Sequence, residues 1–554
     1  MMRGLSRLTM ISVILAIVVI AGAASFIILQ PRAPATPGAT ATQVVTTPTE
    51  AGRTTQPGTP IQQTPASKKD ILKVAIGTDL DTVDPHGQTS ITVHNVLRHV
   101  YETLVWLDDR GNVVPWLAER WDVSQDGLVY TFYLRKGVRF HDGSEFNATV
   151  VKANIDRWID PTVRVPLRAQ LGPVKGAEVI DPYTVKIYLK EPFAPFLRAL
   201  SSYLLITSIE VIKRFGNQTI TEVVGTGPYK FVSWEKGRKV VLERFDDYWG
   251  QKPAIKRIEW LIIPEASTRI AALLSGDVDF IYAAPAPDLP RLSNDPRVKI
   301  ITPVSNLIMF IALAPKGPLA DPRVRQALNY AVDKKAIIDS VLYGLGIPAD
   351  SPIPPHFFGY AKMPYYEYDP EKAKRLLAEA GYPDGFKIVL LHSVGGSGYV
   401  QDKQQAEALQ AYLSKIGIQV ELKTGDWPYY IASLLKPTDQ LEWDAALVGV
   451  GPPVSEAYFT LNSQFTCAQI PPKGINTARY CNPKVDELIN LASKELNENK
   501  RAELYRQAIE IIWRDAPWIF LYTQKQFFAS SSTLEGIFVY PSGLQIYFQF
   551  AYFK

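Results

Sequence analysis

Few residues of this 554-residue chain stand in arrangements that could carry out chemistry. The six histidines are scattered, and the sequence has no nucleophile elbow, no phosphate loop, no metal-binding His pair at helical spacing and no Cys-x-x-Cys. His141 precedes Asp142, a pairing that could serve acid–base catalysis, but the following glycine favours a surface turn with a packed histidine. A glycosidase site of two carboxylates needs only two acidic residues that come together in the fold, and these leave no sequence motif. A membrane-tethered hydrolase is therefore kept as the alternative function.

The most informative stretch is 225–250, GTGPYKFVSWEKGRKVVLERFDDYWG. Its first two glycines permit positive φ and a close backbone approach, and Pro228 prevents a helix from starting there. Aromatic and β-branched runs at 229–234 and 239–245 then predict a hairpin that ends at Asp-Asp-Tyr-Trp-Gly. We expect most of these residues to support the fold.

This block resembles the signature of the dipeptide/oligopeptide class of extracellular solute-binding proteins, family 5, which deliver ligands to ABC importers. The resemblance extends over essentially 70–554 and implies an α/β fold of the periplasmic-binding-protein type, class II and three-lobed, with a central cleft. It also implies a binding protein that needs no cofactor. The other segments that match family markers are 115–121, 126–135, 140–143, 267–274, 321–331 and 369–373.

The N-terminal segment 1–30 is predicted to be a signal or transmembrane anchor. Its uncharged apolar run, 8–29, follows two arginines and is long enough to span a bilayer. No Cys follows the run, which excludes a lipoprotein anchor, and Ala21-Gly22-Ala23 could serve a signal peptidase. The opening Arg-Gly-Leu-Ser resembles the prepilin-like signals of archaeal binding proteins, in which cleavage after Gly4 leaves the helix on the mature protein.

The segment 31–69 is predicted to be a disordered linker. It is rich in Thr, Pro, Ala and Gln and nearly lacks bulky apolar residues, so it cannot bury enough surface to repay the entropy of ordering. Its many hydroxyl groups suggest O-glycosylation. We therefore expect the folded part to stand on the extracytoplasmic face of the membrane, anchored by the N-terminal helix.

Charge and composition narrow the choice of partners. Lys and Arg number 59 against 55 Asp and Glu, a formal charge of +4 without long like-charge blocks, which argues against a nucleic-acid surface. The resemblance implies a monomer that passes a small ligand to ABC permease and ATPase subunits.

Alternating strands and helices over 386–450 are typical of an α/β lobe. The predicted organisation is lobe I from 70–104, 219–315 and 525–554, a small accessory lobe from 105–218, and lobe II from 316–524, with two chain crossings that fit a hinge.

The mechanism that the resemblance implies is closure of two α/β lobes over the ligand, with aromatic faces and backbone groups in contact with it. Packing is the competing interpretation for each candidate. The candidates for the lining are Thr82, Val83, Thr226, Asn306, Trp427, Tyr429, Gly451 and Glu456.

The ligand class stays open because this sequence departs from the peptide-binding pattern. In those members a strand ending Gly-Trp-x-Gly is followed by an Asp that pairs with the ligand's ammonium group. Here the stretch 449–456 reads GVGPPVSE, without the Trp and without an Asp directly after it. Glu456 either takes over that role or begins a helix. We predict peptides, with oligosaccharides that stack on Trp and Tyr as the alternative.

Cys467 and Cys481 are the only two cysteines. In an extracytoplasmic domain such a pair suggests a disulfide, and some dipeptide-binding members carry a similar pair around an Asn-rich turn. The alternative is two free buried thiols.

Overall fold

The computed structural model describes residues 65–394 and 399–554. The predicted anchor, with most of the predicted linker, lies outside these residues. Within the described ranges, no helix has the length and apolar character that a membrane span requires.

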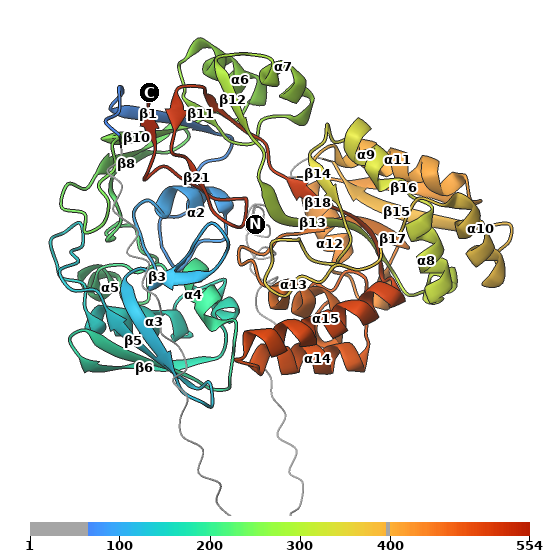
Figure 1. Ribbon diagram of the computed structural model, residues 1–554, viewed down its shortest axis with the longest axis horizontal. Coiled ribbons are helices and arrows are strands. Elements are labelled where there is room, and N and C mark those ends of the chain that lie inside the picture. Colours follow the sequence, from blue (N-terminus) through green and yellow to red (C-terminus); the bar gives the residue numbers. More distant parts are fainter. Residues whose placement is uncertain (1–64, 395–398) are drawn as a thin grey trace, which may run out of the picture.

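The first lobe is built on a seven-stranded sheet in the order β12-β19-β11-β1-β10-β9-β8 (Figure 1). The central strand β1 pairs in parallel with β10 and β11. Every second side chain of β1, at Leu72, Val74 and Ile76, packs into the core of this lobe. The strands are β1 (Ile71–Ile76), β8 (Tyr229–Glu235), β9 (Lys239–Arg244), β10 (Arg257–Ile262), β11 (Phe280–Ile281), β12 (Val298–Ile301) and β19 (Phe528–Ser531), and the helices are α2 (Ile91–Leu97), α6 (Ala266–Ser275) and α7 (Leu289–Ser293).

Short two-stranded pairs complete the first lobe. The C-terminal segment returns over α2, where the Asn95 side chain accepts a hydrogen bond from Ile546 N–H at 3.0 Å and donates one to Leu544 O at 3.2 Å. These pairs are β2 (Val105–Leu107) with β3 (Val113–Pro115), β20 (Leu534–Glu535) with β23 (Tyr552–Phe553), and β21 (Phe538–Val539) with β22 (Ile546–Tyr547).

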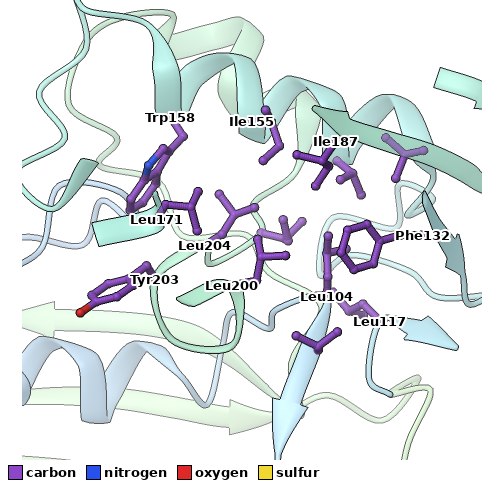
Figure 2. Packing of buried hydrophobic residues seen from close by; sticks show 14 of the residues in the cluster. Leu104, Leu117, Phe132, Ile155, Trp158, Leu171, Ile187, Leu200, Tyr203 and Leu204 are labelled. Carbon is purple, nitrogen blue, oxygen red and sulfur yellow. The ribbon is translucent and has the colours of Figure 1, made fainter. Parts of the chain in front are cut away.

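The accessory lobe has a four-stranded antiparallel sheet in the order β4-β5-β7-β6. Figure 2 shows its core, where Ile155 of α3 lies beside Ile187 of the sheet and Trp158 of α3 lies beside Leu171. Asn147 caps α3, because its side chain accepts hydrogen bonds from two backbone N–H groups of the first turn. The elements are β4 (Ala118–Val123), β5 (Val129–Leu134), β6 (Val174–Asp181), β7 (Thr184–Leu189), α3 (Ala148–Ile159), α4 (Phe196–Tyr203) and α5 (Ile209–Phe215).

The second lobe is built on a six-stranded sheet in the order β14-β18-β13-β17-β15-β16. Asp321 and Asp369 cap α8 and α10, each ahead of a proline at the first turn. The strands are β13 (Val304–Leu313), β14 (Gly346–Pro348), β15 (Lys387–Ser393), β16 (Gln419–Gly425), β17 (Ala445–Val450) and β18 (Trp518–Lys525). The helices are α8 (Pro322–Tyr330), α9 (Lys334–Ser340), α10 (Pro370–Glu379), α11 (Asp402–Ser414), α12 (Trp427–Leu434), α13 (Ala457–Phe465), α14 (Pro483–Lys494) and α15 (Glu498–Asp515).

The chain passes between the two large sheets at two adjacent places, between β12 and β13 and between β18 and β19. The two segments lie side by side, since Gln526 N–H donates to Pro303 O at 2.9 Å. The boundary expected after residue 315 assigned β13 to lobe I, but this strand pairs with β17 and β18. We correct it to the second lobe, because the apolar strand begins directly after the crossing.

A disulfide joins Cys467 to Cys481 with an S–S distance of 2.03 Å, as the resemblance implied. It closes the loop between α13 and α14. Asn476 holds the inside of this loop by donating to Thr466 O at 3.1 Å and to Tyr480 O at 2.7 Å.

Candidate functional site at the junction of the two sheets

The carboxyl ends of the parallel strands in both large sheets point toward the chain crossings. In the first sheet, Ile281 at the end of β11 pairs with Ala529 near the start of β19. In the second sheet, Val450 at the end of β17 pairs with Ile308 in the first half of β13. In open α/β sheets, ligands bind outside the carboxyl ends of the strands. The junction between the two sheets is therefore the candidate site.

Asn306 holds the second-lobe side of this junction together. Its buried carboxamide donates to Pro452 O at 2.6 Å and accepts from His356 Nε2 at 2.7 Å and from Ser455 Oγ at 3.0 Å. Burial lowers the pKa of His356 to about 4, so its ring is neutral at physiological pH. The backbone of Asn306 also donates to Ser542 O of the first lobe at 2.8 Å. This candidate residue positions the loop after β17.

The aromatic candidates lie beside the same loop. The Trp427 ring stacks on Tyr430 at 5.4 Å and meets Tyr399 edge-on at 6.0 Å. The Tyr399 hydroxyl accepts from Gly449 N–H at 3.0 Å and donates to Gly449 O at 3.2 Å, which fixes the end of β17. The Tyr429 side chain is 40% exposed.

Gly451 lies where this loop passes close to β13. A Cβ atom at this position would be 3.2 Å from Leu307 Cα, so a larger residue would push the loop away from the strand. Trp427, Asn306 and Gly451 therefore share one side of the junction.

The candidates of the first loop, Thr82 and Val83, follow β1 on the other side. Val83 is buried in the first-lobe core, and Thr82 Oγ1 accepts from Asp84 N–H at 3.1 Å. Asp84 forms a buried ion pair with Arg157 of the accessory lobe at 2.7 Å. The loop therefore joins the first lobe to the accessory lobe.

Thr226 belongs to a buried network around the Glu102 carboxylate. Glu102 Oε1 accepts from Trp116 Nε1 at 2.7 Å and from Tyr248 OH at 2.8 Å. Its Oε2 accepts from Thr226 Oγ1 at 2.7 Å and from Trp249 Nε1 at 2.9 Å. Burial raises the pKa of Glu102, and the four hydrogen bonds oppose that rise. The two ends of the 225–250 block thus meet on one carboxylate and support the fold there.

The first two glycines of this block serve close packing. A Cβ on Gly225 would be 2.0 Å from Val100 O, and one on Gly227 would be 2.7 Å from His99 O. Neither glycine has positive φ, although the sequence led us to expect it. Glycine is required at these two positions because a side chain would collide with the backbone.

Glu456 is fully buried and engaged by protein cations. Its Oε1 lies 3.3 Å from Arg501 Nε and accepts from Tyr505 OH at 3.2 Å, and its Oε2 lies 3.2 Å from Arg198 Nε. Burial raises its pKa, whereas the charges of Arg501 and Arg198 oppose the rise. In this conformation the carboxylate faces two guanidinium groups rather than an open cleft.

Sequence reasoning missed several buried polar groups: one beside Asn306, one on α4, and one three residues after Ser542, whose carbonyl accepts from Asn306 N–H. They share a nitrogen or oxygen that has no hydrogen-bond partner within the described part of the chain, and such groups are costly unless something else bonds to them. The C-terminal segment that contains one of them touches α4, where Ser201 Oγ and Tyr540 OH are 3.3 Å apart. No motif signals these groups, because they come from distant segments. They are Ser202 Oγ, His356 Nδ1 and both amide atoms of Gln545.

Comparison with known proteins identifies the family. The family described as bacterial extracellular solute-binding proteins, family 5 Middle, matches residues 112–472. Glutathione-binding protein GsiB of Pectobacterium atrosepticum is 34% identical over 475 residues, which cover 85% of this chain and 92% of that protein. The structure of HbpA2 from Haemophilus parasuis matches with a TM-score of 0.78 and 31% identity, over 87% of this chain and 100% of that chain. DppA from Helicobacter pylori, in complex with the peptide STSA, matches with a TM-score of 0.70 and 28% identity, over 86% of this chain and 98% of that chain. This chain therefore belongs to family 5 of the bacterial extracellular solute-binding proteins.

Proposed function

We propose that this protein binds short peptides at the junction of its two large sheets and delivers them to the membrane subunits of an ABC importer. The observation that carries the proposal is the 34% identity to a glutathione-binding protein over 85% of the chain. DppA, solved with a bound peptide, supports the same class of solute. Family 5 proteins bind solutes and are not enzymes, so the hydrolase alternative falls away.

The chemistry around the junction supports a peptide as solute. The hydroxyl of Ser202 and the amide of Gln545, which have no partner among the described residues, can donate to and accept from peptide bonds. Aromatic rings such as Trp427 supply apolar contact area. Hydrogen-bonding groups set in apolar surroundings are typical of small-molecule sites.

A thermal-shift screen of the full chain tests the solute class. Glutathione and a panel of di- to pentapeptides should raise the melting temperature in a concentration-dependent manner, because a solute that binds only the folded state stabilises it. Cello- and malto-oligosaccharides form the second arm of the screen. A response to oligosaccharides without any response to peptides would overturn the proposal in favour of a sugar receptor.

We also propose that residues 8–29 anchor the protein to the membrane and that the Thr- and Pro-rich segment holds the folded lobes outside the cell. The support is the apolar run in the sequence. Fractionation of expressing cells tests this placement, since an anchored protein remains in the membrane pellet after a carbonate wash. Release of the intact chain into the soluble fraction would refute it.

A further inference from the structure

The accessory lobe and the second lobe meet at a contact that lies apart from the two chain crossings. Ala194 N–H donates to Ser493 O of α14 at 2.7 Å, and the Phe193 ring meets Tyr458 edge-on at 5.1 Å. Figure 1 shows α14 and α15 beside the accessory lobe at this place. Because the accessory lobe is joined to the first lobe through the Glu102 network, any opening at the crossings has to separate this contact.

The two oxygens of Glu456 serve different lobes at this contact. Oε1 belongs to the second lobe, where Arg501 Nε lies 3.3 Å away and Tyr505 OH donates at 3.2 Å. Oε2 lies 3.2 Å from Nε of Arg198, which is on α4 of the accessory lobe. The side chains of Arg198 and Glu456 are 9% and 0% exposed, so water screens their attraction little.

We propose that the Arg198–Glu456 ion pair is an interlobe latch, and that Glu456 is a positioning residue for solute binding because it holds the lobes closed over the junction. The inference rests on the proposed function. It gives Glu456 a role that differs from contact with the solute's ammonium group.

The latch can open without leaving a bare buried charge. When the lobes separate, Glu456 keeps Arg501 and Tyr505 as partners within its own lobe. Arg198 keeps its hydrogen bond to Gly111 O, in the turn between β2 and β3, and gains water. Loss of one partner from a buried pair is costly chiefly when the remaining charge stays uncompensated. Here both charges retain partners, so closure is reversible.

The latch is connected to the candidate site through the backbone. Glu456 directly follows the loop after β17, which Asn306 grips through Ser455 Oγ at 3.0 Å. Phe358 N–H donates to Ser455 O at 3.1 Å, and the Phe358 ring lies 5.0 Å from the guanidinium of Arg198 and 4.4 Å from that of Arg501. A solute that fixes the loop therefore also fixes the carboxylate that Arg198 meets.

Distance measurements on the full chain test the latch. Spin labels at Lys175→Cys on the accessory lobe and Asn490→Cys on α14 report the separation of the lobes. Arg198→Met removes the cross-lobe charge and keeps the apolar stem, so the distance distribution without solute should shift to longer values. The matched control is Lys494→Met, which removes an exposed cross-lobe pair with Glu191 at 3.4 Å and should leave the distribution unchanged.

Solute kinetics supply the second readout. With glutathione as the probe, Arg198→Met should increase the dissociation rate about tenfold, Arg198→Lys should restore part of the difference, and Lys494→Met should have no effect. An unchanged distance distribution in Arg198→Met, or a change of equal size in Lys494→Met, would overturn the latch. If neither glutathione nor the peptide panel binds, the proposed function fails, while the distances measured without solute still decide on the latch.

Discussion

At the scale of single residues, Glu102 has an unusual environment. It is buried, no Lys or Arg forms an ion pair with it in the described structure, and four neutral donors point at its two oxygens. Charge-assisted hydrogen bonds of this kind are stronger than neutral ones and can replace the water that burial removes. Glu102 thus ties the 225–250 block to Trp116 at the base of the accessory lobe.

Glu102→Gln should destabilise the protein by about 3 kcal/mol, because an amide offers one acceptor oxygen where four donors converge and places its own N–H groups against them. Urea denaturation followed by tryptophan fluorescence measures the change in the free energy of unfolding. The control is Glu243→Gln on an exposed position of β9, which should alter stability by less than about 0.5 kcal/mol. Equal effects of the two substitutions would contradict this role for Glu102.

His141 links the accessory lobe to the same block, since its Nε2 lies 2.9 Å from Gly227 O. Burial lowers its pKa from 6.5 to about 4. Below pH 6.5 His141 becomes protonated in the unfolded chain but stays neutral in the folded state. This residue therefore lowers the free energy of unfolding as the pH falls from 6.5 toward 4.

Between pH 7 and pH 4.5, the free energy of unfolding should therefore decrease less in His141→Gln than in the wild type. The expected difference between the two decreases is about 2 kcal/mol. Denaturant titrations of both proteins across this range give the difference. Parallel decline of the two curves would show that His141 does not titrate as inferred.

The sequence could indicate the residue types that gather around Glu102 but not the carboxylate at their centre. Thr226, Trp249 and Trp116 each stand in a recognisable motif, whereas Glu102 stands in an ordinary helix-to-strand connection. Ser202 and Gln545 carried no signal at all, because an unpartnered polar atom becomes visible only when the surrounding segments are in place. Sequence motifs predict local structure, but which distant segments come together can be seen only in the folded structure.

At the scale of elements, the sequence predicted the positions of strands and helices better than it predicted the boundaries between lobes. The aromatic and β-branched runs predicted the hairpin of β8 and β9, and the family-marker segments 321–331 and 369–373 contain the starts of α8 and α10. Two crossings were predicted, but the first was placed after residue 315 instead of directly after β12, because only Thr302 and Pro303 separate β12 from the equally apolar β13. Register and sheet membership depend on pairing partners that a local pattern does not contain.

The loop between α13 and α14 is the element that the disulfide constrains. A closed loop with a sequence separation of 14 corresponds to about 3 kcal/mol in the chain-entropy model. The double substitution Cys467→Ser with Cys481→Ser should lower stability by up to about this amount and leave peptide affinity within about twofold, because the loop lies away from the carboxyl ends of the second sheet. Thermal unfolding and calorimetric titration measure the two quantities. A large loss of affinity with unchanged stability would contradict this assignment.

At the scale of the whole molecule, two lobes joined by paired crossings can rotate as bodies about a short hinge. The first and second lobes have their own cores. The described contacts between the lobes gather at the crossings and where Val454 and Phe459 of the second lobe join the core of the accessory lobe. A solute bound at the junction would contact both lobes and shift the equilibrium toward closure by as much as it prefers the closed state.

The most direct test of the central claim, that the solute lies at the junction of the two sheets, is calorimetric titration of Gln545→Leu with the peptide that gives the largest thermal shift. Leucine has a similar shape and removes a buried amide that has no partner in the described structure, so the melting temperature should stay the same or rise. If Gln545 bonds to the solute, affinity should fall at least about tenfold, while Gln404→Leu on the exposed face of α11 should bind like the wild type. Unchanged affinity in Gln545→Leu would contradict the placement of the solute beside this residue.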